Sequence, residues 1–136
     1  MNQIHHIGIV STNIEYILTA FDLDINDSSE SYIDQEQGNT LYFFYLPLNK
    51  LWLECVIPHR PVSTVSTFAN KHGLALHHLG FISSDLIQEK TKRDTIPSMF
   101  PIGSYSLFIN SFGGKIKTLF FAYKGLIIEF IKQLDS

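Results

Sequence analysis

Two histidine doublets and two glutamates recur at matching places in this 136-residue chain. The segment IHHIGIVSTNI begins at Ile4, and LHHLGFISSDL repeats its pattern from Leu76, which is 72 residues later. Downstream, Glu54 in LWLECV is echoed 75 residues later by Glu129 in LIIEFI. Imidazole nitrogens and carboxylate oxygens are common ligands of divalent metals, so a duplicated pair of them predicts one shared metal site rather than two unrelated polar positions.

The duplication also predicts how four distant side chains come together. In each copy the histidine lies on the first strand and the glutamate on the last, so neighbouring strands would present both on one face. Pairing of the two copies then gathers His6, Glu54, His78 and Glu129 around one point. Two neutral imidazoles and two carboxylates suit Zn²⁺, Ni²⁺, Co²⁺, Mn²⁺ or Fe²⁺, with room left for water or substrate oxygens. Without an ion, two carboxylates among apolar residues would be costly to desolvate.

The strand pattern indicates which histidine of each doublet is the ligand. Alternate side chains in a strand point to opposite faces, and the apolar residues that follow each doublet should face the helices. His6 and His78 therefore face the metal, and His5 and His77 are second-choice ligands or partners of the ligands. A single strand histidine is more often a hydrogen-bonded core residue, but the joint recurrence of all four residues favours a shared site.

The elements that must position these residues repeat as well. Each half is predicted to fold as a strand, a helix and three strands, which gives an α+β protein of two tandem βαβββ modules in an open half-barrel sheet around a metal-binding cleft. We expect one domain over residues 1–136, with module one at 3–61, a linker helix at 62–73 and module two at 74–133. The expected strands are residues 3–10, 31–36, 41–46, 51–57, 75–82, 105–110, 115–123 and 125–132, with Pro97 and Pro101 in a loop.

Composition excludes several classes of function. With 13 acidic and 10 basic residues, the net charge of -3 argues against a nucleic-acid partner, which would need a basic face. No apolar run is long enough to span a bilayer, and because the histidine doublet lies so near the first residue we expect no signal sequence. Cys55 is the single cysteine, so an internal disulfide is excluded, and we expect a cytoplasmic protein.

The two histidine segments, each followed by a capped helix, with LWLEC and GLIIEF closing the halves, resemble the vicinal oxygen chelate superfamily. Its members include glyoxalase I, methylmalonyl-CoA epimerase, extradiol dioxygenases and antibiotic-resistance proteins. The linker from Ser63 to Gly73 and the segment GGKI at Gly113 are most similar to methylmalonyl-CoA epimerases, whereas the His-Glu-His-Glu ligand set is similar to that of glyoxalase I. The resemblance covers almost the whole chain, and related folds often form homodimers.

This resemblance implies a metal-dependent isomerase or lyase that acts on an acyl-CoA or another α-carbonyl compound. Two substrate oxygens would chelate the metal, which stabilises the enediolate formed when the α-proton leaves. The expected base is Glu129 or Glu54. The position that resembles a second acidic base in epimerases falls near Leu41 or Tyr42, neither of which is acidic, while Glu36 lies just before the turn.

Two other functions stay open at this point. One is a glyoxalase I-like lactoylglutathione lyase, although the sequence offers no clear basic residues for the glutathione carboxylates. The other is a non-catalytic module that binds a small molecule or sequesters an antibiotic. Weaker features are a basic run that could meet a phosphate but is more typical of a solvated helix face, and strand aromatics that could line a pocket but are more typical of a core: Lys90, Lys92, Arg93, and Tyr42 to Tyr45.

Overall fold

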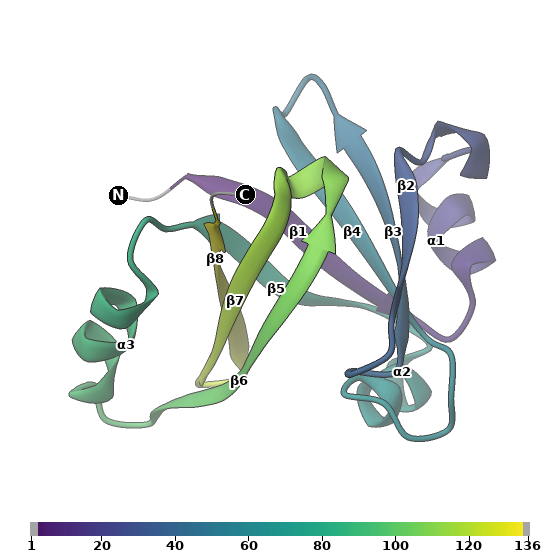
Figure 1. The fold of residues 1–136 in the computed structure, drawn as a ribbon. Helices are drawn as coiled ribbons and strands as arrows, with labels where there is room; N and C mark the ends of the chain where they lie inside the picture. Colours follow the sequence, from purple (N-terminus) through teal and green to yellow (C-terminus); the bar gives the residue numbers. More distant parts are fainter. Residues whose placement is uncertain (1–2, 135–136) are drawn as a thin grey trace. The chain divides into compact units, whose positions relative to one another are not determined.

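The computed structural model describes residues 3–134, which form eight strands, three α-helices and two short 3₁₀ helices (Figure 1). The first half contains β1 (Ile4–Ser11), α1 (Ile14–Phe21), η1 (Ile25–Asp27), β2 (Glu30–Asp34), β3 (Asn39–Leu46) and β4 (Leu51–Pro58). After α2 (Ser66–His72), the second half contains β5 (Leu74–Ile82), α3 (Leu86–Asp94), β6 (Met99–Ile109), η2 (Asn110–Phe112), β7 (Gly114–Tyr123) and β8 (Leu126–Gln133).

The strands are hydrogen-bonded in the order β2-β3-β4-β1-β5-β8-β7-β6, so β2 and β6 are the edges of an open sheet. This order confirms the predicted α+β fold with two tandem βαβββ modules. The chain divides into two compact units. The N-terminal unit runs from Ile7 to His77, and the C-terminal unit combines residues 3–6 with residues 78–134.

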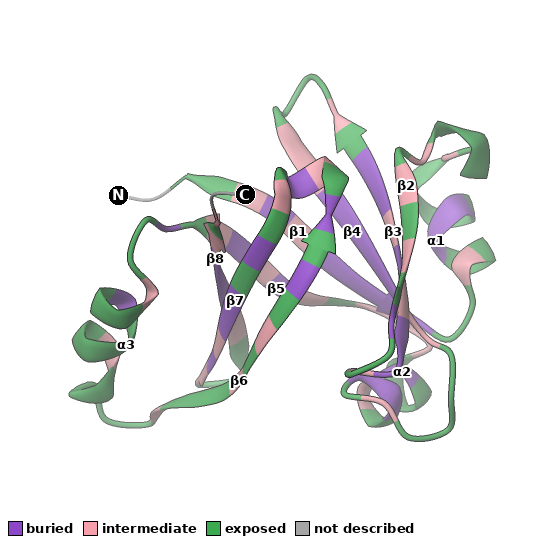
Figure 2. Ribbon diagram, in the orientation of Figure 1, coloured by how far each residue is buried: buried purple, intermediate pink, exposed green. Residues whose placement is uncertain are grey.

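The N-terminal unit is built on the antiparallel strands β2, β3 and β4. Helix α1 begins at the N-cap Asn13, whose side chain accepts a hydrogen bond from the backbone N–H of Glu15. Its apolar side packs with the strands in a core that buries Ile9, Ile17, Leu18, Phe44, Leu53 and Cys55. Burial is concentrated along β3 and β4 (Figure 2). This packing leaves the opposite face of the strands for other residues.

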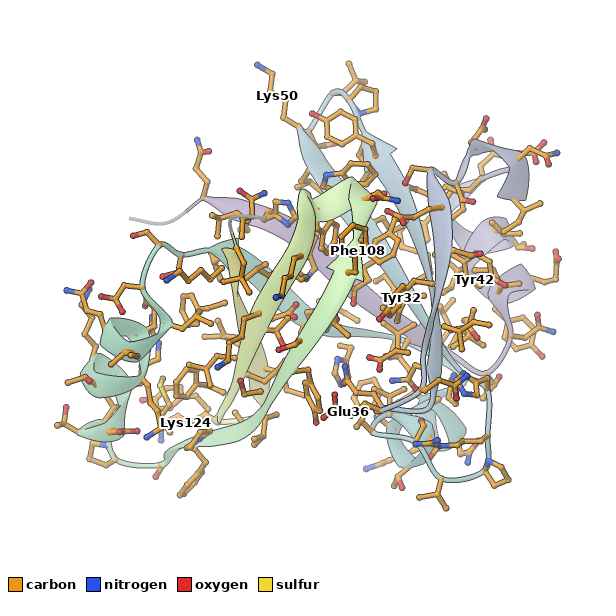
Figure 3. All side chains as sticks on the ribbon, viewed as in Figure 1. Tyr32, Glu36, Tyr42, Lys50, Phe108 and Lys124 are labelled. Atoms are coloured by element: carbon orange, nitrogen blue, oxygen red, sulfur yellow. The ribbon has the colours of Figure 1, made fainter. Side chains whose placement is uncertain are left out.

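Side chains alternate between the two faces of β2, β3 and β4, so those that do not face α1 lie on the face away from that helix. Tyr32 and Tyr42 extend to opposite sides of the β2–β3 ribbon (Figure 3). Tyr42 packs against the core under α1, whereas Phe43 is paired with Glu54 and shares its face. The aromatic run in β3 is therefore divided between a structural core and the face that carries Glu54.

In the C-terminal unit, β5 is parallel to β8, and β8, β7 and β6 are antiparallel. Helix α3 packs over one face of these strands, where Leu119, Phe121 and Phe130 are buried. The Arg93 guanidinium lies 4.1 Å from the centre of the Phe130 ring and forms a 2.6 Å ion pair with Glu89. The opposite face of the same strands carries His78 and Glu129.

Strand β6 begins at Met99, so Pro101 lies within the strand and not in the predicted loop. An edge strand can contain a proline because one side of its backbone has no partner strand, and the register of β6 also shifts between Pro101 and Gly103. Lys50 and Lys124 both have positive φ in the turns before β4 and β8 (Figure 3). None of the described helices has the length and apolar character that crossing a membrane requires.

Candidate metal centre

Three ligand atoms converge in the C-terminal unit. The Nε2 atom of His6 lies 2.6 Å from Oε1 of Glu129 and 3.1 Å from Nε2 of His78. Nε2 of His78 lies 3.2 Å from the same carboxylate oxygen. All three residues are buried, with exposed fractions of 0% for His6, 2% for His78 and 3% for Glu129. The sequence-predicted residues of this unit therefore form one compact cluster.

Strand register explains why two of these residues meet. In the parallel pair β5–β8, Gly80 is the partner of Glu129, and His78 lies two residues before Gly80. Residues two apart in a strand point to the same face, so His78 and Glu129 lie on the same side, away from α3. The alternation of apolar residues in the sequence predicted that His78 faces away from the helices, as the structure shows.

Gly80 provides the space that the His6 ring occupies. A Cβ atom added at Gly80 would lie 1.9 Å from Cε1 of His6, and 2.3 Å from both Nδ1 and Nε2 of that ring. Real side-chain contacts do not approach so closely, so only glycine at this position allows the imidazole to lie against the backbone of β5. The glycine in the HHLG segment is thus part of the site.

The second nitrogen of His6 is also engaged. Its Nδ1 atom lies 3.0 Å from Nδ1 of His5. The ring of Phe112 stacks on His6 with a centroid distance of 5.1 Å and an interplanar angle of 30°, and it meets His5 edge-on at 4.6 Å. His5 is therefore a partner of His6, one of the two roles that the sequence predicted for it.

The electrostatics of this cluster favour an ionised carboxylate and a neutral His5. Burial raises the pKa of Glu129, but the charge of His6 and the hydrogen bonds from His6 and His78 outweigh it and lower that pKa to about 2. Burial, reinforced by the nearby charge of His6, lowers the pKa of His5 to about 4, although the Glu129 charge opposes this shift. An ionised carboxylate is the state in which Glu129 can bind a metal.

The three ligand atoms fit a divalent ion. Ligands that bind one ion at about 2.0–2.2 Å lie roughly 3 Å apart when the angles between them are about 90–110°. The distances of 2.6, 3.1 and 3.2 Å between the cluster atoms are close to this spacing. Two imidazoles and one carboxylate are also the donor types that Zn²⁺ and similar ions take. The residues present therefore suit a metal.

Glu54 lies in β4 of the N-terminal unit, where 7% of its surface is exposed. The neighbouring Cys55 points to the core, and burial together with the Glu54 charge raises the pKa of the Cys55 thiol to about 12. A thiol with so high a pKa is not ionised at neutral pH and is no nucleophile. Glu54 is thus the residue of this strand segment that can serve a metal or a proton transfer.

The strand register adds one acidic residue that the sequence analysis missed. Glu30 of β2 is the partner of Phe43, and Phe43 is the partner of Glu54, so all three share one face. Two strand spacings separate Glu30 from Glu54 by about 10 Å. The signal in the sequence was weak because β2 is short and its bounds could not be fixed without the pairing. Glu36, in contrast, is exposed in the turn after β2 (Figure 3).

The other residues singled out from the sequence have structural roles. Lys90 forms an exposed ion pair with Asp94, and Arg93 is engaged by Glu89 and the Phe130 ring. His77 lies edge-on to the ring of Phe68 at 5.2 Å. The basic run on α3 is thus the surface of a helix with local partners, on the face of the strands opposite the histidine cluster.

Comparison with known proteins supports the fold assignment. No family model matches the sequence, and no curated protein does. Among solved structures, a Streptomyces coelicolor methylmalonyl-CoA epimerase variant in complex with 2-nitronate-propionyl-CoA has a TM-score of 0.76 at 17% identity and covers 99% of both chains. Methylmalonyl-CoA epimerase from Mycobacterium tuberculosis has a TM-score of 0.74 at 15% identity, covering 97% of this chain and 88% of its own.

A hypothetical protein from Bacillus halodurans C-125 is similarly close, with a TM-score of 0.75 at 18% identity over 99% of this chain and 96% of its own. At these identities the likeness establishes the fold and leaves the reaction open. The resemblance to the vicinal oxygen chelate superfamily, drawn from the two histidine segments, is confirmed in its fold.

Proposed function

We propose that this protein is a metal-dependent isomerase or lyase that removes a proton next to a carbonyl group, most similar in activity to methylmalonyl-CoA epimerase. The observation that carries the proposal is the buried convergence of two imidazole nitrogens and one carboxylate oxygen, from His6, His78 and Glu129. The shared fold with methylmalonyl-CoA epimerases supports the same class of chemistry.

The ion would be held by these three residues together with Glu54. Glu54 is proposed as the fourth ligand because its side chain is buried and it is the repeat equivalent of Glu129. The donor set suits Zn²⁺, Ni²⁺, Co²⁺, Mn²⁺ or Fe²⁺. Such an ion, when bound, supplies a Lewis acid that draws electron density from a substrate carbonyl and acidifies the adjacent C–H bond.

The protein's own residues then handle the proton. Glu129 is ionised at neutral pH because its pKa is lowered to about 2, so it can accept a proton without first losing one. A carboxylate is a weak base, so it can act only on a C–H bond that has been strongly acidified. Glu54 is the alternative base. Burial of the cluster excludes bulk water, which protects the carbanionic state from random protonation.

Epimerisation also requires a proton donor on the other side of the substrate carbon, because inversion returns the proton to the opposite face. Neither Leu41 nor Tyr42 carries a carboxylate. Glu30 is the candidate for this second role because it shares the face of Glu54, about 10 Å away, a distance that leaves space for a substrate. With Glu54 as the base and Glu30 as the donor, one of these two glutamates would remove the proton and the other would return it.

The substrate proposed first is an acyl-CoA with a carboxylate or a second carbonyl near its acidic carbon. This choice is supported by the epimerase structures of the same fold, one of which is described with methylmalonyl-CoA bound. A glyoxalase I-like lyase is the second candidate, because Glu54 completes a His-Glu-His-Glu set similar to that of glyoxalase I. Epimerases of this kind can carry Gln at the position of Glu54.

Solvent isotope exchange tests the proposal. The metal-loaded protein in D₂O should incorporate deuterium at the α-carbon of methylmalonyl-CoA, and Glu129→Gln should abolish that incorporation. Glu36→Gln is the matched control, because Glu36 is exposed in a turn, and it should exchange at the wild-type rate. Turnover of the methylglyoxal–glutathione adduct in place of exchange would favour the lyase. A protein that binds a metal but acts on neither substrate would indicate a binding module, and full exchange by Glu129→Gln would remove Glu129 as the base.

A further inference from the structure

The His6 ring is held through both of its nitrogen atoms. Nε2 faces the cluster, 2.6 Å from Oε1 of Glu129 and 3.1 Å from Nε2 of His78, and Nδ1 lies 3.0 Å from Nδ1 of His5. A contact of this kind is unusual, because neighbouring side chains in a strand normally point to opposite faces. Here the Phe112 ring touches both imidazoles and holds them together.

The chemistry of an imidazole determines which of the two histidines donates the hydrogen bond and which accepts it. A neutral histidine carries one N–H, and a nitrogen that binds a metal must offer its lone pair. If Nε2 of His6 binds the ion, the hydrogen is on Nδ1 and needs an acceptor. The lone pair of His5 Nδ1 is the acceptor at 3.0 Å, and His5 then carries its own hydrogen on Nε2.

We propose that His5 is a positioning residue for metal binding, which accepts the Nδ1–H of His6 and so keeps Nε2 of His6 free for the ion. This inference rests on the proposed metal centre, and it holds for any reaction or binding role that the centre serves. Outer partners of this kind fix the orientation of a ligand ring and raise its basicity.

The surroundings of His6 make His5 the main influence on which nitrogen of His6 carries the hydrogen. The side chain is fully buried, so bulk water does not compete as an acceptor for its N–H. The backbone of Gly80 lies directly against the ring, and Phe112 stacks on it. The ring therefore cannot move far, and its hydrogen position is set mainly by what its two nitrogens meet.

The loss of such a partner typically weakens metal binding by about 10- to 100-fold. His5→Phe keeps a ring against Phe112 but removes the acceptor nitrogen, so it should weaken Co²⁺ binding by this factor. His5→Asn can offer an amide oxygen near the place of Nδ1, and it should recover most of the affinity. His59→Asn is the matched control, because His59 is exposed in the N-terminal unit, and its removal should leave Co²⁺ affinity at the wild-type value.

The test measures the Co²⁺ dissociation constant by competition with a chromophoric chelator for the wild type and these three variants. Wild-type affinity in His5→Phe would overturn the role of His5, and so would an Asn variant that binds no better than the Phe variant. A wild-type protein that binds no Co²⁺ would contradict the proposed metal centre itself. Normal binding by both the wild type and His5→Phe would contradict only the role of His5.

A second measurement needs no substitution, and it decides the question even if His5→Phe does not fold. In the Zn²⁺-loaded wild type, ¹H–¹⁵N spectra of the imidazoles report which nitrogen carries the hydrogen. The inference predicts hydrogen on Nδ1 of His6 and on Nε2 of His5. Hydrogen on Nδ1 of His5 would overturn it, because His5 would then be unable to accept.

Discussion

Replacing Gly80 with alanine should disable the metal centre through a single methyl group. The added Cβ would lie 1.9 Å from Cε1 of His6, whereas carbon atoms in contact are about 3.5–4.0 Å apart. The imidazole would therefore have to move by roughly 1.5 Å or more, and metal–ligand distances tolerate only about 0.2 Å. Loss of the His6 ligand should weaken Co²⁺ binding by more than about 100-fold, beyond the effect of losing an outer partner.

The assay is a Co²⁺ titration alongside urea unfolding. Overpacking should destabilise Gly80→Ala by about 1–3 kcal/mol while the fold persists. Gly125→Ala is the matched control, because Gly125 has a φ of +85° and no atom within 4 Å of an added Cβ. It should lose about 1 kcal/mol through backbone strain and keep the wild-type affinity.

A double variant separates the clash from other effects. If the methyl group acts on the His6 ring, the additional change His6→Ala should relieve the clash and return part of the lost stability, without returning metal binding. Wild-type Co²⁺ affinity in Gly80→Ala would refute the reasoning, because the ring would then fit beside the methyl group. Strictly additive stability losses in the double variant would refute it as well.

Three further predictions concern stability and the second proton transfer. Thr118→Val should stabilise the protein by about 1 kcal/mol in urea unfolding, because Oγ1 of Thr118 is buried and has no hydrogen-bond partner among the described residues; a loss of stability would contradict this. Metal-free protein should lose stability as the pH falls from about 6.5 to about 4, because His5 binds a proton more readily in the unfolded chain than in the folded protein. It should lose stability again from about 4.5 to about 2, because Glu129 is also protonated more readily in the unfolded chain. The His5 part should be about 1–2 kcal/mol after allowance for solvent screening, and a flat profile in that range would contradict it. Glu30→Gln should keep deuterium exchange with one enantiomer of methylmalonyl-CoA but slow epimerisation, and wild-type epimerisation would exclude Glu30.

The sequence predicted the site through its internal repeat. Strand alternation distinguished His6 from His5 and His78 from His77, because the apolar residues after each doublet had to face the helices. The structure brings His6, His78 and Glu129 together as this pattern indicated. The role of Gly80 was less clear from the sequence, because a glycine is expected both where strands pack closely and where a ligand ring needs space.

Other features depended on pairing that a single sequence does not contain. Pro101 indicated a loop, but an edge strand tolerates proline because one side of its backbone has no partner. Glu30 stood in an uncertain strand, and only the register with Phe43 places it on the face of Glu54. The contact between His5 and His6 also needed coordinates, because neighbours in a strand normally diverge.

X-ray absorption at the cobalt edge tests the central claim most directly. Protein loaded with Co²⁺ should contain one ion per chain and show the scattering of two imidazole rings together with oxygen ligands. The variant His78→Ala should lose one of those two imidazoles. A protein that binds no stoichiometric cobalt, or cobalt whose spectrum lacks imidazole scattering, would contradict the assignment of this cluster as a metal centre.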